Sequence, residues 1–125
     1  MNGMNYMTRK DLIRELDLIV SLIVRKRHPY CVQCGSKTNL TCGHVITRKI
    51  YSTRWALNNC YTQCKGHNLN HKYEFHHYIN WYIQEHGLNA WNTLYKQSTN
   101  KKKFTDAELQ TLLNDLIFFY NQNYS

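Results

Sequence analysis

The sequence predicts an α+β fold, in which a small metal-stabilised ββα core lies between α-helices at both ends of the chain. Apolar residues recur at helical spacing near both termini. Between them lie two pairs of potential metal ligands and two short apolar stretches of strand length. A chain of 125 residues has room for one domain with a modest core. We therefore expect a single domain over residues 1–125, divided into an N-terminal helix (8–27), a metal-bound core with a long helix (28–87) and C-terminal helices (88–121).

The N-terminal helix is expected to begin at Thr8 and to end near Lys26. Thr8 can cap the first turn, and Asp11 lies where a helix dipole favours negative charge. Pro29, the only proline, prevents the helix from continuing through His28. The apolar face of this helix is expected to pack in the core, and it consists of Leu12, Leu16, Ile19, Val20 and Ile23.

The middle of the chain predicts two strands joined by a basic loop. Apolar and polar residues alternate well enough over residues 40–46 to predict a strand, and His44 lies on it. Residues 48–53 are expected to form the loop. Residues 55–57 are expected to form a second short strand that returns to Asn58 and Asn59.

The C-terminal third predicts three helices. One long helix is expected from about Gly66 to His86, because Gly87 is a good C-terminal stop. A short helix through Trp91 follows, and residues 97–103 are expected to form a polar linker. Residues 105–108 (Thr-Asp-Ala-Glu) form a capping box that begins the last helix.

Charge along the chain is strongly segregated. The formal net charge is +8, and residues 18–73 contain no Asp or Glu. Nine basic residues fall within that window, namely Arg25, Lys26, Arg27, Lys37, Arg48, Lys49, Arg54, Lys65 and Lys72. A uniformly solvated surface mixes its signs, so the window indicates a surface that faces a polyanion.

The N-terminus does not resemble a secretory signal, and the apolar run at residues 18–24 is too short to span a bilayer. We therefore expect an intracellular protein with no membrane partner. In such a protein, paired Cys-x-x-Cys spacing more often binds metal than forms disulfides.

Two ligand pairs about thirty residues apart predict one tetrahedral, structural zinc site. The first pair is Cys31 and Cys34, and the second is Cys64 and His67. An alternative replaces His67 by Cys60, which gives an all-thiolate site. The cysteines left over, Cys42 and Cys60 in the first assignment, are expected to be small buried packing residues.

The order of these residues resembles the HNH, or ββα-metal, nucleases. In that family, a zinc knuckle precedes a strand that ends in a general-base histidine. A mid-motif asparagine follows, and a metal-binding His or Asn comes directly after the second zinc pair. These positions fall on His44, Asn59 and Asn68.

Over nearly its whole length the chain is similar to the NinG/Rap recombination proteins of lambdoid phages. The matching motifs are Cys31-Val32-Gln33-Cys34-Gly35, Gly43-His44, Arg54-Trp55-Ala56-Leu57-Asn58-Asn59, Glu74-Phe75, Gly87-Leu88 and Phe104-Thr105-Asp106-Ala107-Glu108-Leu109. There are three departures from the family patterns. Gly43 stands where many HNH enzymes carry a metal-binding Asp or His, His67 replaces a cysteine, and the segment from Asn68 to Glu74 is about three residues short.

The resemblance implies a Mg²⁺- or Mn²⁺-dependent DNA endonuclease that hydrolyses phosphodiester bonds in branched recombination intermediates such as Holliday junctions. His44 would be the general base, Asn59 would fix the loop, and Asn68 would bind the catalytic metal, with Glu74 as a further candidate ligand. Candidate DNA contacts are Arg48, Lys49, Arg54, Lys65 and Lys72. A homodimer would suit a junction that needs two cuts, and a phage-encoded protein would act in the host cytoplasm. Two alternatives stay open: a nicking or packaging HNH nuclease without branch preference, and a non-catalytic zinc-stabilised DNA-binding module.

Overall fold

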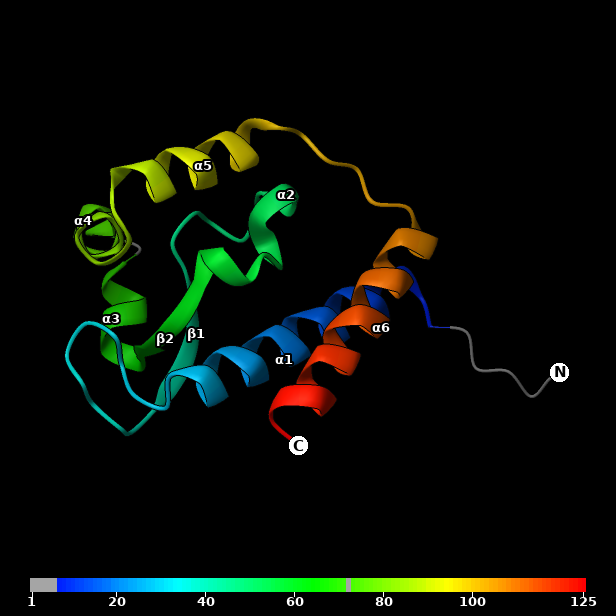
Figure 1. The fold of residues 1–125 in the computed structure, drawn as a ribbon, viewed down its shortest axis with the longest axis horizontal. Coiled ribbons are helices and arrows are strands. Elements are labelled where there is room, and N and C mark those ends of the chain that lie inside the picture. Colours follow the sequence, from blue (N-terminus) through cyan, green and yellow to red (C-terminus); the bar gives the residue numbers. More distant parts are fainter. Residues whose placement is uncertain (1–6, 72) are drawn as a thin grey trace, which may run out of the picture.

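The computed structural model describes residues 7–71 and 73–125. Its secondary structure is mostly helical, with one two-stranded antiparallel sheet (Figure 1). The elements in chain order are α1 (Arg9–Arg27), β1 (Leu40–His44), α2 (Tyr51–Arg54), a 3₁₀ turn (Leu57–Asn59), β2 (Cys60–Cys64), α3 (Lys65–Asn70), α4 (Phe75–His86), α5 (Leu88–Thr99) and α6 (Asp106–Asn123). The predicted α+β class is confirmed.

The two terminal helices lie side by side and enclose the larger part of the core (Figure 1). Both begin as predicted. Thr8 caps α1 through a capping box with Asp11, and Thr105 caps α6 through a capping box with Glu108. Their buried faces meet Trp55 and Cys60 in one apolar cluster, with Leu12, Leu16, Val20, Ile23, Val24, Leu109, Leu113 and Leu116.

The β-hairpin separates this cluster from a second one. Val45 and Tyr61 belong to the second cluster, together with Tyr78 and Tyr82 of α4 and Leu94 of α5. Successive side chains of a strand point to opposite faces, so Cys60 and Tyr61 of β2 belong to different clusters. The hairpin register pairs His44 with Cys60 and Gly43 with Tyr61.

Three predicted elements in the middle of the chain are wrong in their bounds. The first strand ends at His44, because the backbone of Ile46 is held by the Asn59 side chain and not by a neighbouring strand. The second strand is Cys60–Cys64, not 55–57, since Trp55 is buried against the terminal helices. The second half of the expected loop 48–53 belongs to the short helix α2, which begins at Tyr51.

The predicted long helix over 66–86 is also wrong, because it consists of two helices, α3 and α4. The break is a turn in which the Asn70 carbonyl accepts from the N–H groups of Tyr73 and Glu74 at 2.9 and 2.7 Å. The break lets α3 pack on both strands while α4 packs on α5. Gly87 ends α4 as predicted, whereas α5 continues to Thr99, so the linker is shorter than the expected 97–103. No helix within 7–71 and 73–125 is both long and apolar enough to cross a membrane.

Candidate functional site

Four predicted metal ligands converge where the knuckle meets the end of the hairpin. Cys31 and Cys34 lie in a tight turn, in which Gly35 has a φ of 78° and donates its N–H to the Cys31 carbonyl at 2.7 Å. Cys64 ends β2, and His67 lies on the first turn of α3. The ligand atoms of all four residues lie within 4.8 Å of one another. This group could hold one metal ion.

The separations between these atoms fit a tetrahedral centre. The Sγ atoms of Cys34 and Cys64 are 3.8 Å apart, and His67 Nδ1 lies 3.7 Å from Cys31 Sγ and 3.3 Å from Cys64 Sγ. Ordinary zinc bond lengths in a tetrahedron give edges of about 3.8 Å between two sulfurs and about 3.6 Å between sulfur and nitrogen. The alternative ligand Cys60 lies elsewhere, in a group with Cys42 and His44.

Backbone contacts hold the knuckle in place. Burial alone would raise the pKa of the Cys31 thiol, but hydrogen bonds from the backbone of Cys64, Gln33 and Cys34 outweigh it, and the pKa lies below its ordinary value. Val32 donates its N–H to the Thr62 carbonyl at 2.9 Å, which ties the knuckle to β2. At Cys31 these contacts therefore favour thiolate, the form that binds metal.

His44, the last residue of β1, points toward α1 and lines a cavity of about 200 Å³. The other lining residues are Asp17, Val20, Ser21, Cys42, Arg48, Arg54 and Trp55. Its Nε2 lies 2.9 Å from the Arg54 carbonyl oxygen, which can only accept, so this nitrogen carries the proton. Burial lowers the pKa of His44, and the hydrogen bond to the Arg54 carbonyl offsets this only in part. The imidazole is therefore neutral near pH 7.

Asn59 fixes the loop between the two strands. Its side chain is fully buried. Its Oδ1 accepts from the Ile46 N–H at 2.8 Å, and its Nδ2 donates to the carbonyls of Ile46 and Thr53, both at 3.0 Å. Thr53 immediately precedes Arg54, so Asn59 holds the segment whose carbonyl orients His44.

Asn68 and His44 contact opposite faces of β1. The Asn68 Nδ2 donates to Thr41 Oγ1 at 2.9 Å. Thr41 and His44 are an odd number of residues apart on the strand, so their side chains leave it on different faces. Asn68 does not line the cavity that His44 lines. The structure therefore does not bring these two predicted site residues together.

The position before His44 has no room for a side chain. A Cβ built on Gly43 would lie 1.9 Å from Gln63 Oε1. Gln63 is itself fully buried, and its Nε2 donates to Gln33 Oε1 at 2.5 Å. Gln63 thus fills the space that a ligand side chain at position 43 would need.

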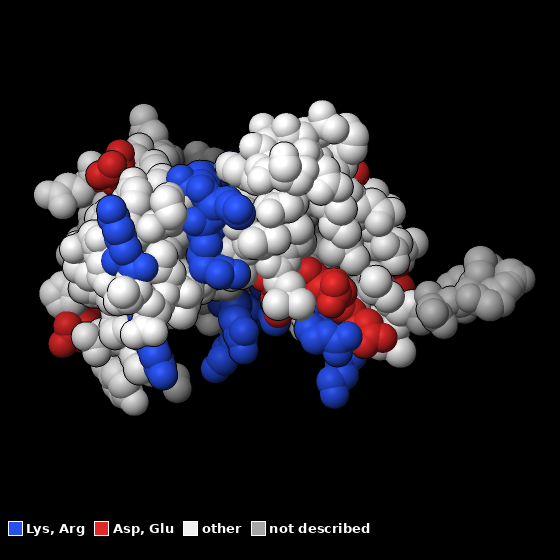
Figure 2. Space-filling model, turned by 90° about the horizontal axis from the view of Figure 1, so that it is seen from below, with Lys and Arg blue, Asp and Glu red and all other residues white. Residues whose placement is uncertain are grey.

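The basic residues divide into exposed and structural ones. Arg48, Lys49 and Lys65 are exposed, and Lys72 lies outside the described residues. Arg54 forms an ion pair within the protein, because its Nη2 and Nε lie 2.7 and 3.1 Å from the two carboxylate oxygens of Asp17. On the face in Figure 2, Lys and Arg side chains gather toward the middle, while Asp and Glu lie mainly to either side.

Asp17 is a site residue that the sequence did not reveal. Besides Arg54, its carboxylate accepts from Trp55 Nε1 at 2.8 Å. Burial raises the pKa of Asp17, but the hydrogen bonds from Arg54 and Trp55 outweigh it and keep the pKa below its ordinary value. Asp17 lies on a helix, 37 residues before its partner Arg54, and no local pattern indicates the contact.

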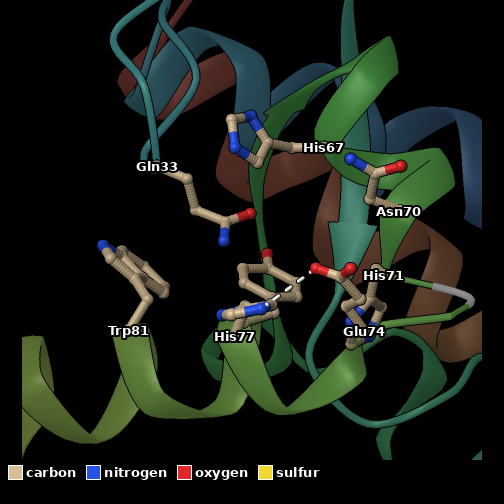
Figure 3. Close-up of a pocket in the computed structure, with 8 residues that line it drawn as sticks. Gln33, His67, Asn70, His71, Glu74, His77 and Trp81 are labelled. Atoms are coloured by element: carbon tan, nitrogen blue, oxygen red, sulfur yellow. Dashed lines mark ion pairs between the residues drawn. The ribbon is translucent and has the colours of Figure 1, made fainter.

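Glu74 lines a separate and larger cavity of about 390 Å³ (Figure 3). The other lining residues are Gln33, His67, Asn70, His71, His77, Tyr78 and Trp81. The Glu74 carboxylate lies 3.0 Å from His77 Nε2, and Asn68 does not line this cavity. His71 and His77 were not predicted as site residues, although His67, His71, Glu74 and His77 recur at intervals of three and four residues.

Comparison with known proteins gives no assignment: no family model, no curated protein and no solved structure matches the chain. The geometry and chemistry of the side chains therefore carry the functional proposal.

Proposed function

We propose that the protein is a zinc-stabilised, metal-dependent DNA endonuclease of the HNH type, with His44 as its general base. The observation that carries this proposal is the state of His44. Its imidazole is neutral, its protonated nitrogen is fixed on the Arg54 carbonyl, and it lines an open cavity. Among the described residues, no hydrogen-bond partner engages its other ring nitrogen. A neutral imidazole with one nitrogen anchored and the other available is the form that a general base needs.

In the proposed reaction, the free nitrogen of His44 takes a proton from water. The hydroxide attacks phosphorus, and the bond to the 3′ oxygen breaks in line with the attack. The leaving oxygen takes a proton from solvent, and His44 releases its own proton to solvent. Arg48 lines the same cavity, is exposed, and can hold a phosphate oxygen beside the base. Arg54 is a positioning residue in this scheme, since its guanidinium is bound to Asp17 and its carbonyl orients His44.

Asn59 also acts through other groups. It bonds to the backbone at both ends of the loop and keeps the Arg54 carbonyl within reach of His44. This role explains the asparagine without requiring contact with DNA.

The described residues do not supply a complete magnesium site. Mg²⁺ prefers six oxygen ligands in an octahedron. Asn68 offers one amide oxygen, Glu74 pairs with His77 in another cavity, and position 43 is glycine. A catalytic Mg²⁺ would depend on phosphate and water for most of its ligands.

The ion in the four-ligand group is proposed to be zinc. Three thiolates and one imidazole suit zinc and leave no open position, which is typical of a structural site. The ion would join the knuckle to β2 and α3 across a segment that has little apolar core of its own.

One observation favours the second candidate, a zinc-stabilised DNA-binding module without catalysis. His44 and Asn68 contact opposite faces of β1, whereas a one-metal nuclease needs its base and its metal near the same phosphate. The neutral, oriented state of His44 is the state that a general base needs, so the nuclease is the stronger proposal.

The test is a cleavage assay on a four-way junction and on linear duplexes of the same sequence, each with and without Mg²⁺. The proposal expects cleavage that requires the metal. Preference for the junction would support the NinG/Rap-like assignment, and equal cleavage would support a general HNH nuclease. Binding without cleavage of either substrate under all conditions would leave the DNA-binding module.

A further inference from the structure

Two cysteines that the zinc cluster does not use lie beside His44. Cys42 and His44 are two residues apart on β1, so their side chains share a face. The hairpin register places Cys60 of β2 opposite His44. As a result, the Sγ atoms of Cys42 and Cys60 and a ring nitrogen of His44 all lie within 4.8 Å of one another. The expected packing role of the two cysteines does not account for an imidazole in the same group.

Two thiolates and one imidazole form a donor set for a thiophilic cation. Magnesium and calcium prefer oxygen, so they do not suit it. The three atoms would need to approach by at most about 1 Å to reach the edges of a tetrahedron around zinc. We propose that Cys42, His44 and Cys60 form a second metal site, which takes Zn²⁺ or a similar thiophilic divalent cation.

The surroundings leave space for a fourth ligand. Cys42 and His44 both line the cavity of about 200 Å³ between β1 and α1, and a cavity of that size admits water. Cys60, by contrast, is fully buried, and it closes the site from the side of the core. Three protein ligands with one position left to water distinguish this site from the closed knuckle cluster.

Metal binding requires local changes in hydrogen bonding. The Cys60 Sγ lies 3.7 Å from the Arg54 carbonyl oxygen, the same oxygen that accepts from His44 Nε2 at 2.9 Å. Both thiols lose their protons when they bind a cation, so binding strengthens as pH rises. A cation held by His44 also blocks the proposed general base, a consequence that rests on the proposed function, whereas the binding itself does not.

Cobalt(II) tests the site without any DNA substrate. The reduced, metal-free full-length chain is refolded with Co²⁺, and bound cobalt per chain is measured together with its thiolate-to-cobalt absorption. The wild type is expected to bind one more cobalt ion per chain than Cys42→Ala and to show the additional thiolate absorption. Equal cobalt binding by the two proteins overturns the proposal.

A second variant covers the case in which Cys42→Ala fails to fold. His44→Gln keeps both thiols and a similar side-chain volume, so it removes only the imidazole ligand. It should also bind one cobalt ion fewer than the wild type, with an unchanged circular dichroism spectrum. A His44→Gln protein that binds as much cobalt as the wild type, with the same affinity, overturns the proposal as well.

Discussion

Replacement of Asp17 by Asn tests whether the Asp17–Arg54 pair holds the loop that orients His44. The pair joins α1 to α2 through two hydrogen bonds, at 2.7 and 3.1 Å, and Asp17 also accepts from Trp55 at 2.8 Å. The Arg54 side chain is only 13% exposed, and that of Asp17 is 30% exposed. Asn at position 17 offers one acceptor oxygen in place of two, and its amide N–H groups face a guanidinium that only donates.

The exposure of the pair determines the expected cost. Breaking a fully buried ion pair costs about 3–5 kcal/mol, and a fully exposed pair contributes about 0–1 kcal/mol. The Asp17–Arg54 pair is mostly but not fully buried, so the cost of breaking it lies between these two values. We therefore expect Asp17→Asn to lower the free energy of unfolding by about 2–3 kcal/mol and the Tm by roughly 10 °C.

Urea denaturation followed by circular dichroism, with zinc present throughout, measures this cost. Asp115→Asn is the matched control, because Asp115 is exposed on α6 and forms no ion pair within the part of the chain that the structure describes. The control should change the stability by less than about 0.5 kcal/mol. An Asp17→Asn protein as stable as that control would refute the reasoning.

Three further predictions test other parts of the account. Gly43→Ala should lower the unfolding free energy by about 1–3 kcal/mol through overpacking, because the added Cβ would meet the buried Gln63. Gly66→Ala is the control, because a Cβ at that position has its nearest neighbouring atom 4.0 Å away, and equal stabilities of the two variants would contradict the prediction. Replacing Arg48 and Lys49 together by Ala should reduce the slope of log DNA affinity against log salt by about one to two units, and an unchanged slope would locate the DNA elsewhere, for example on residues 101–103. Cys34→Ser should lose bound zinc and much of the helical signal, as measured by elemental analysis and circular dichroism, and full zinc content would exclude Cys34 as a ligand.

The features that were correctly predicted are those that neighbouring residues determine. Capping boxes need only residues three apart, so the starts of α1 and α6 were predictable from Thr8 and Thr105. Ligand spacing likewise reflects the local turn that directs two side chains at one ion, and the four expected metal ligands do converge.

The features that were missed depend on contacts between distant segments. Tyr61, Thr62 and Gln63 of β2 are all buried, so this strand shows no alternation of polar and apolar residues. The role of Arg54 follows from Asp17 on another helix, and no charge pattern distinguishes a paired arginine from a free one. The side of β1 on which His44 lies depends on how the hairpin packs between two apolar clusters.

The central claim is that His44 acts as a general base, and single-turnover cleavage of a four-way junction and of plain duplex tests it most directly. His44→Ala should cut about a hundred- to ten-thousand-fold more slowly than the wild type, with structural zinc and DNA affinity nearly unchanged, because a base that acts on the attacking water contributes little to holding phosphate. His76→Ala, which removes an exposed histidine of α4, should cut at the wild-type rate. If His44→Ala also cut at the wild-type rate, the HNH assignment would be wrong and the zinc-stabilised DNA-binding module would be the better account.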